Sequence, residues 1–244
     1  KQIKEKSQTV KPDNKPSNNT INSEVFKKSQ INENIKIENK ILKNSQEEKV
    51  FGIYDPAENN FNLNMWTQTE AEDVRSSFNR INKIQLSNTA TKLFEKTILS
   101  FSFPPKSMEE KEFVNLKIDW LVENKRIDLI EKFLKQNNTF PNKKKLIQYL
   151  VDSNIAKANI KEGCNKIDFL DKSVKDTYLD KFKIYCLVFN KKKNEAQLQF
   201  DILREENKSD NFFDNKISFL LGLTSKTTKK IKDDNLLNFY LSSV

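Results

Sequence analysis

The sequence predicts an all-α fold, a right-handed solenoid of helical hairpins behind a disordered N-terminal tail. The first observation is a short apolar pattern, Ile-x-x-Leu followed by Val or Leu, whose copies begin at Ile118, Ile147, Ile184 and Ile217. The starts are unevenly spaced, but their mean interval, about 33 residues, lies in the range in which one repeat is one antiparallel pair of helices. The second observation is that positions i, i+3 and i+4 share one helix face, so each copy supplies an apolar stripe that a neighbouring repeat must cover.

Composition divides the chain into three parts. Residues 1–48 are rich in Lys, Asn, Ser, Gln and Glu and bury too little apolar surface to offset the entropy of ordering, so we expect a disordered polar tether. Residues 49–68 contain Gly52 and an Asp-Pro turn among several aromatic residues, which predicts an extended aromatic segment packed on the helices. Residues 69–244 carry the helical patterns and form the predicted α-helical repeat domain.

Two helices are expected before the repeated pattern begins. Thr69 and Glu72 have the spacing of a capping box, in which each side chain satisfies a free backbone N–H, and this helix should end near Ile81. Ser87 is expected to cap a second helix, which ends before a Pro-Pro pair. A second capping box should start the first repeated hairpin, at Ser107 and Glu110.

The hairpins are predicted from apolar stripes that polar turns separate. Turns are expected at residues 123–125 and 190–193, where short polar runs interrupt the stripes. A last repeated helix should stop at Gly222, which is placed like a helix C-cap. The remaining segment combines the basic stretch 228–232 with apolar residues from Leu236 onward, and we expect it to form a capping helix.

The spacing within the hairpins resembles the tetratricopeptide class. That repeat places an apolar or aromatic residue in its first helix, and nine and thirteen residues later a small residue and an aromatic in its second. Leu187, Ala196 and Phe200 match these offsets. Two other sets match with a larger residue at the small position or with one inserted residue: Leu121, Ile130 and Leu134, then Leu150, Ile160 and Cys164. The class's first-helix Gly is absent, so the resemblance implies a divergent tetratricopeptide-like fold.

A second resemblance is local and lies ahead of the first hairpin. The runs at 52–56 (Gly-Ile-Tyr-Asp-Pro) and 63–66 (Leu-Asn-Met-Trp), with the helices after them, resemble the start of a family of secreted helical-repeat proteins of alphaproteobacteria. In that family a signal peptide and a low-complexity linker precede the helices. The resemblance implies a periplasmic or otherwise exported protein, with a signal peptide removed ahead of Lys1, and a binding role with no catalytic residue to carry over. A cytoplasmic location remains the alternative.

The residue inventory excludes several kinds of chemistry. The chain contains no His, so Ser-His-Asp, Cys-His and His-ligated metal sites are excluded. The three glycines lie far apart, at 52, 163 and 222, so the spacing of a P-loop or a dinucleotide-binding fingerprint does not occur, and we expect neither a cofactor nor a metal. Carboxylate-only chemistry remains formally open, so a peptidoglycan-cleaving enzyme is the second alternative to the non-catalytic protein that we expect.

The cysteines and the hydropathy give two further expectations. The chain has two cysteines, Cys164 and Cys186. The second helix of one repeat packs on the first helix of the next, which would bring them close enough for one optional bridge, but two small buried thiols are the favoured interpretation. No run of 18 or more apolar residues occurs, so no transmembrane helix is predicted.

The positive charge supports the first alternative function, a basic surface that binds nucleic acid or anionic lipid. The net charge is +9 and the pI is 9.3, and lysine runs at 143–145, 191–193 and 229–230 could line one edge of the solenoid. The favoured interpretation is compositional, because Lys, Asn, Ile and Phe are abundant together, as expected of an AT-rich genome. Nucleic acid is therefore not the expected partner, whereas a membrane surface stays open.

The expected function is a non-catalytic protein-interaction module or scaffold of the cell envelope, with a protein or peptide partner and no small-molecule substrate. Stacked helix pairs leave a concave face formed by the first helix of each repeat, and such faces commonly bind peptides or partner helices. Four polar or aromatic residues are predicted to face it: Asp119, Gln148, Tyr149 and Tyr185. The extended segment offers a further aromatic surface, for a sugar or a peptide, at Trp66 and Tyr54.

Overall fold

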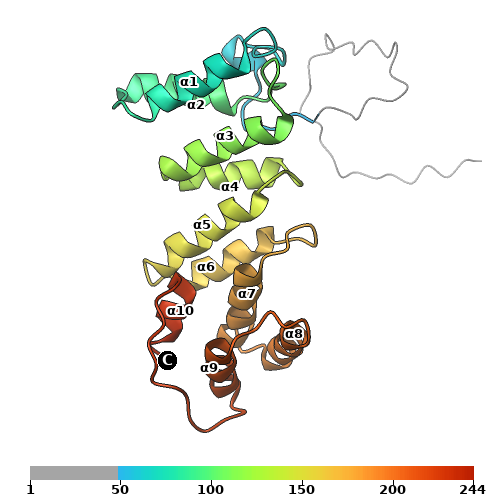
Figure 1. Ribbon diagram of the computed structural model, residues 1–244, viewed down its shortest axis with the longest axis vertical. Helices are drawn as coiled ribbons and strands as arrows, with labels where there is room; N and C mark the ends of the chain where they lie inside the picture. Colours follow the sequence, from blue (N-terminus) through green and yellow to red (C-terminus); the bar gives the residue numbers. More distant parts are fainter. Residues whose placement is uncertain (1–48) are drawn as a thin grey trace, which may run out of the picture. The chain divides into compact units, whose positions relative to one another are not determined.

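A computed structural model describes residues 49–244, and the tether predicted for residues 1–48 lies outside the described residues. Residues 49–244 form ten α-helices and no strand (Figure 1), so the all-α prediction is confirmed for them. The helices are α1 (Ala71–Ile81), α2 (Asn88–Leu99), α3 (Glu110–Glu123), α4 (Ile127–Gln136), α5 (Lys143–Ile155), α6 (Ile160–Lys166), α7 (Thr177–Phe189), α8 (Lys193–Glu205), α9 (Asn211–Leu221) and α10 (Leu236–Leu241), with 3-10 turns η1 (Ala57–Asn59) and η2 (Ile167–Phe169).

Some helix ends follow the predicted local chemistry. The hydroxyl of Ser87 accepts a hydrogen bond from the backbone N of Ala90 at 3.3 Å, and so caps α2 as expected. Asp176 and Asp210 cap α7 and α9 in the same way. Gly222 ends α9 with a φ of 84°, in the left-handed region where glycine carries no Cβ penalty.

The two predicted capping boxes are wrong. Neither α1 nor α3 has a side-chain cap, because they begin later than predicted, after Glu70 and Glu109. The extended backbone of Glu70 pairs with Lys106, and the N–H of Lys106 donates to Thr69 O at 3.0 Å. This pairing of distant segments replaces the local cap. Ser107 adopts a φ of 62° in a turn and is also not in a capping position.

Three helix pairs end their first helix with the same turn. Lys125, Ala158 and Lys191 have φ values of 53°, 55° and 61°. The number of residues from the first to the second equals the number from the second to the third, and we call this number the repeat interval. The residue after each donates its N–H to a carbonyl five residues earlier, a bond that closes the helix end: Arg126 to Leu121 at 3.0 Å, Asn159 to Asn154 at 2.9 Å and Lys192 to Leu187 at 2.8 Å. The pairs α3–α4, α5–α6 and α7–α8 therefore share one turn geometry and one spacing.

The repeat interval corrects the register of the predicted repeat. The residue one repeat interval after Ile118 is Val151 of α5, and not Ile147, which the sequence pattern predicted. Ile184 and Ile217 follow at further single intervals, as predicted. The predicted second copy was therefore displaced by four residues, about one helical turn. The error arises because α5 is apolar along one whole face, where Ile147, Val151 and Ile155 are all buried.

The corrected register also changes the match within the second helix pair. Asn154 and Leu187 are equivalent because each accepts the backbone hydrogen bond that closes its turn. Gly163, and not Ile160, lies nine residues after Asn154, just as Ala196 lies nine residues after Leu187. A Cβ on Gly163 would lie 3.2 Å from Cζ of Phe182 and 3.3 Å from Cβ of Asn154. No inserted residue is needed, and the small side chain at this position permits a close approach of α6 to α5 and α7.

Helices that follow one another in the chain pack on one another from α3 to α8, and α7 also packs on α9. Aromatic side chains fill much of this core, and Phe133, Phe182, Phe200 and Phe213 are fully buried. Ring contacts extend the packing to the first two helices. Phe94 of α2 lies 5.3 Å from Phe78 of α1 and 5.9 Å from Trp120 of α3, between ring centroids.

The segment before α1 is tied to the ends of α2 and α4. The N–H of Ile53 donates to Leu99 O at 2.6 Å, and the Asn137 side chain donates to Gly52 O at 2.9 Å. A Cβ on Gly52 would lie 2.5 Å from the backbone N of Phe101. Only glycine permits the two backbones to approach this closely.

A fully buried lysine fastens the same segment to α3. Nζ of Lys117 donates to Phe51 O at 2.6 Å and to Ser100 O at 3.0 Å, and it lies 4.7 Å from the centroid of the Phe113 ring. Burial lowers the pKa of Lys117 to about 7. At the equivalent position of α9, the buried Lys216 donates to Val244 O at 2.9 Å. Lys117 thus holds the segment that precedes the helices, and Lys216 holds the last residue of the chain.

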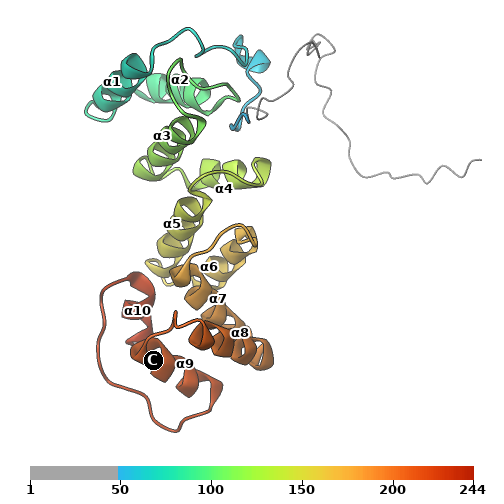
Figure 2. The ribbon, with the colours of Figure 1, turned by 45° about the vertical axis from the view of Figure 1, so that its right-hand side comes forward.

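The C-terminal segment differs from the prediction. Residues 228–232 are not helical, and the last helix, α10, is only six residues long. After α9 the chain runs back, and α10 packs on α5 (Figures 1 and 2). The expected capping helix therefore covers the side of an earlier helix pair.

Candidate interaction surface

The four predicted groove residues lie on α3, α5 and α7, the first helices of the three pairs, whose shared side we call the first-helix face. Asp119 and Tyr185 occupy equivalent positions of the repeat, with Asp152 as the counterpart on α5. Gln148 and Tyr149 lie one turn earlier on α5. The surroundings of these positions differ from one helix to the next.

Asp119 takes part in a contact that joins successive first helices. Its Oδ1 accepts a hydrogen bond from Nζ of Lys145 on α5 at 2.7 Å. One repeat later, the hydroxyl of Tyr178 on α7 donates to Asp152 on α5. Lys145 and Tyr178 are themselves one repeat interval apart, so the same contact is made twice with different chemistry.

Burial sets the protonation of the second contact. It raises the pKa of the Asp152 carboxyl, against the opposing effect of the hydrogen bond from Tyr178. Burial, followed by the hydrogen bond to Asp152, also raises the pKa of Tyr178. The tyrosine hydroxyl therefore stays protonated and donates to the carboxyl group.

Gln148 and Tyr149 are half-buried on α5. The counterparts of Gln148 are Asn115 on α3 and Lys181 on α7, and each bonds to the residue directly before a later helix, Asn142 before α5 and Asp210 before α9. Nδ2 of Asn142 donates to Asn115 at 2.7 Å, and Nζ of Lys181 donates to Asp210 at 2.6 Å. Tyr149 packs against the core. Both side chains keep some exposure, so they are the predicted residues nearest to an accessible surface on α5.

Tyr185 is covered by the last helix. Only 6% of it is exposed, and its ring lies edge-on to Tyr240 of α10 with centroids 5.7 Å apart. Burial, then the hydrogen bond between the two hydroxyls, raises the pKa of Tyr185. Tyr185 therefore faces α10 and not an open groove.

Trp66 and Tyr54 lie in the segment before α1, Trp66 against α3 and Tyr54 against the end of α2. The Trp66 ring packs edge-on to Phe113 with centroids 6.0 Å apart. Its Nε1 is buried without a hydrogen-bond partner in residues 49–244. The backbone of Tyr54 bonds to Leu99 and Phe101 after α2, and burial raises the pKa of its half-buried hydroxyl. The structure does not gather the six predicted residues into one site.

The lysine runs do not share one edge. Residues 143–145 open α5, whereas residues 191–193 span the turn that follows the end of α7, so the two runs lie at opposite ends of the first helices. Each lysine of the first run is also paired with a carboxylate: Lys143 with Asp171 at 2.5 Å, Lys144 with Asp176 at 3.6 Å and Lys145 with Asp119 at 2.7 Å. Little of their charge is left for a phosphate.

An apolar hollow lies beside α10, and we call it the α10 hollow. It has a volume of about 530 Å³, and its apolar walls come from the end of α5, the preceding loop and α10: Ile155, Ala156, Ile231, Leu236, Phe239 and Tyr240. Phe239 is 59% exposed and Ile231 is 71% exposed. Sequence reasoning noted the apolar residues of this segment but missed the hollow, because no local pattern tells where α10 packs.

A second hollow, of about 310 Å³, lies between the end of α1, the start of α2 and the end of α3, and Trp120 and Glu123 are among its lining residues. Burial raises the pKa of two carboxyls, Asp152 and Asp180. Neither of them lines this hollow or the α10 hollow. These two hollows therefore give no support to an acid poised for carboxylate chemistry.

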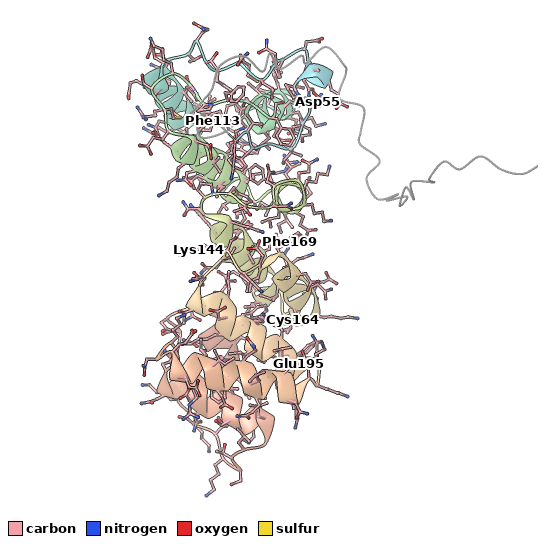
Figure 3. The ribbon with its side chains drawn as sticks, turned by 90° about the vertical axis from the view of Figure 1, so that its right-hand side faces the viewer. Asp55, Phe113, Lys144, Cys164, Phe169 and Glu195 are labelled. Carbon is pink, nitrogen blue, oxygen red and sulfur yellow. A yellow bond between two sulfur atoms is a disulfide. The ribbon has the colours of Figure 1, made fainter. Side chains whose placement is uncertain are left out.

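Cys164 of α6 and Cys186 of α7 form a disulfide, with S–S 2.09 Å and Cα–Cα 5.4 Å; Figure 3 labels Cys164. The interpretation that the sequence favoured, two free buried thiols, is therefore wrong, and the alternative, a disulfide, is what forms. The predicted proximity of the two positions is observed, because α6 packs on α7. The bridge fastens the second helix pair to the third.

Comparison of the chain with protein-family models, curated proteins and solved structures found no match. Within residues 49–244, no group of three or more His, Cys, Asp or Glu side chains is placed to hold a metal ion. No helix of the same residues is long and apolar enough to cross a membrane. The functional argument therefore rests on the surfaces described above.

Proposed function

We propose that this chain is a non-catalytic interaction module, a divergent tetratricopeptide-like solenoid whose first-helix face binds a segment of a partner protein. The observation that carries the proposal is the docking of α10. Leu237 and Leu241 are 1% and 0% exposed, Tyr240 meets Tyr185, and α10 packs on α5. A face that already accepts one amphipathic helix has the apolar chemistry for helix-in-groove recognition.

The even repeat interval supports the solenoid. Repeats of one helix pair bury their apolar stripes on the neighbouring pair, and the shared turn after α3, α5 and α7 gives successive pairs the same internal geometry. Gly163 and Ala196 supply the small residue of the tetratricopeptide pattern at equivalent positions. Ile130 departs from it, and this is the divergent part of the proposal.

The disulfide supports an exported protein of the cell envelope. Disulfides form and persist in oxidising compartments and are rare where thiols are kept reduced. The bridge between Cys164 and Cys186 therefore favours the periplasm or another exported location over the cytoplasm. A scaffold in that compartment would act by holding a partner protein.

The basic alternative receives less support. The lysines at the start of α5 are neutralised by carboxylates, and acidic residues are interspersed with basic ones along the chain. A phosphate-binding surface needs several unpaired cations on one face. The net charge of +9 remains its main argument, and the experiment below separates the two functions by salt.

The test is capture of partners from native cell lysate on the immobilised full chain, washed at low and then at high salt. We expect a discrete protein to stay bound at high salt. Capture should be lost when charge is changed on the first-helix face by Asp119→Lys with Gln148→Glu, and kept in a control on α8, Leu198→Glu, where the side chain is exposed. Circular dichroism checks the helicity of each variant. Retention of nucleic acid or lipid alone, at low salt alone, would contradict the proposal.

A further inference from the structure

We propose that the α10 hollow is the docking site for an amphipathic helix of a partner protein whose polar flanks carry Asp or Glu. This inference rests on the proposed interaction function: it extends the binding surface from the first-helix face, past the end of α5, onto α10, and it gives the partner a chemistry. It depends on three properties of the surface around α10: its apolar walls, the charge at its rim and its open shape.

The apolar residues of α10 face two directions. Leu237 and Leu241 are buried, which accounts for the packing of this helix on α5. Phe239 points elsewhere and is 59% exposed, and Ile231 of the preceding loop is 71% exposed. An amphipathic helix needs only one apolar face to pack on its own protein. The second face leaves a contiguous apolar surface of the kind that marks an interaction site.

Basic residues adjoin the lining residues of the hollow along the chain, and we call these neighbours its rim. Lys157 directly follows the lining residue Ala156, and Lys229 and Lys230 directly precede Ile231. All three lysines are exposed, and none of them forms an ion pair within residues 49–244. Lys232, by contrast, is paired with Asp210 and Asp234.

Of the two exposed carboxylates in this loop, Asp234 is paired with Lys232 and Asp233 is the unpaired one. Three unpaired lysines outweigh it, so the rim carries a net positive charge. Electrostatic complementarity sets specificity and register at an interface more than it sets affinity. The rim therefore selects an apolar partner with acidic flanks from among other apolar partners.

A second copy of this chain does not fit the same surface. In a two-fold symmetric dimer the same patch meets itself, so Lys157, Lys229 and Lys230 of both copies would be brought together. Like charges placed opposite each other at an interface strongly disfavour the complex. The charge that favours an acidic partner thus disfavours self-association through Phe239.

A lipid surface fits less well than a helix. Each basic residue adds only a small attraction to an anionic membrane, so three lysines opposed by one carboxylate give weak attachment. The hollow is open to solvent and has a volume of about 530 Å³, which is in the range of ligand sites, about 300–1,000 Å³. Apolar side chains carried at i, i+3 or i+4 and i+7 on a helix can enter such a surface from outside.

The experiment is selection from a displayed library of helical peptides on the immobilised full chain. Apolar residues are fixed at i, i+3, i+4 and i+7, and the other positions are randomised over Glu, Lys, Gln and Ser. We expect acidic flanks to be enriched on the wild type, and the best peptide to bind at least tenfold more weakly to Phe239→Glu. Leu198→Glu, with a side chain of 60% exposure on α8, is the matched control and should bind as the wild type does.

A charge swap gives the decisive arm. Lys229→Glu combined with Lys230→Glu should reverse the selection from acidic to basic flanks. Enrichment that ignores flank charge, or that Phe239→Glu leaves unchanged, would overturn the α10 hollow as the site while leaving peptide binding, and so the proposed function, in place. Absence of any enriched peptide, with sedimentation on phosphatidylglycerol vesicles instead, would overturn both.

Discussion

The side chain of Lys117 places a titratable group in the core without a carboxylate beside it. Its Nζ is surrounded by Phe51 O, Ser100 O, the Ser102 hydroxyl and the Phe113 ring. Carbonyl oxygens partly replace water around an ammonium group, but burial dominates and lowers the pKa to about 7. An unfolded lysine keeps a pKa near 10.4, so folding is linked to the release of a proton above neutral pH.

The free energy of unfolding should therefore rise with pH above 7. Between about pH 7 and 10 the unfolded lysine binds a proton that the folded one does not, and stability rises wherever the unfolded state binds more protons. The gain is at most about 3 kcal/mol between pH 7 and 9. Urea unfolding of the wild type and of Lys117→Met across this range measures it. The difference between the two isolates Lys117 from Lys216, whose pKa burial also lowers; equal pH dependence would contradict the prediction.

Sequence reasoning found the features of single residues that depend on near neighbours, and missed those set by distant ones. Ser87 caps α2 through a hydrogen bond three residues away, so its pattern was sufficient. Thr69 has the same kind of pattern, but its backbone pairs with Lys106 instead. The burial of Lys117 was also missed, because its two carbonyl partners lie 66 and 17 residues away.

Helix pairs were predicted more reliably than their register. Three of the predicted helices end at the expected turns because polar runs interrupt the apolar stripes at 123–125 and 190–193 and Gly222 stops α9. The position of the second copy was wrong by four residues, because an i, i+3, i+4 pattern overlaps with itself after one turn of an apolar face. Gly163, which shows the true register, has no apolar side chain to contribute to such a pattern.

The packing of α6 can be tested at Gly163. A Cβ at this position already meets Cζ of Phe182 at 3.2 Å, and Phe182 is fully buried. Gly163→Val should cost about 2 kcal/mol of the free energy of unfolding, since extra carbon atoms in a packed core force side chains and backbone to shift. Denaturant unfolding measures the loss.

The control for this change lies on the exposed side of α6. Lys161→Val introduces the same side chain at an exposed position, where substitutions stay within about 0.5 kcal/mol. Valine is a better helix former than glycine and a poorer one than lysine, so any excess loss in Gly163→Val over Lys161→Val is a lower limit on the cost of packing. Equal losses would show that α6 has room at Gly163, and that its closeness to α5 and α7 is not needed.

The disulfide links parts of the molecule that the repeat alone would hold by packing. It closes a loop with a sequence separation of 22 residues, for which the chain-entropy estimate is about 3 kcal/mol. Cys164→Ser with Cys186→Ser should therefore lower the Tm by about 6–12 °C, at 2–4 °C per kcal/mol for a domain of this size. Thermal unfolding measures the shift. Reduction of the wild type should lower its Tm equally, and an unchanged Tm would show that the bridge does not constrain the unfolded chain.

The placement of α10 could not be predicted from the sequence. Its apolar residues indicate that it packs, but nothing local distinguishes α5 from the end of α9 as its partner. The choice depends on contacts between residues far apart in the chain, such as Tyr185 with Tyr240, which are 55 residues apart. The candidate interaction surface follows from this choice, so only its individual residues were visible in the sequence.

The return of α10 to α5 predicts a long-range effect of a C-terminal change. Leu241 is fully buried, so Leu241→Ala should cost about 2–5 kcal/mol of local stability. Hydrogen exchange should then become faster in the last turn of α5, residues 152–155, while α3 and α4 keep their protection. Phe239→Ala, two residues away on the exposed face, should leave the exchange of α5 unchanged. If Leu241→Ala accelerated exchange in α9 alone, α10 would act as a cap on the last helix, and the α10 hollow would lose its wall on α5.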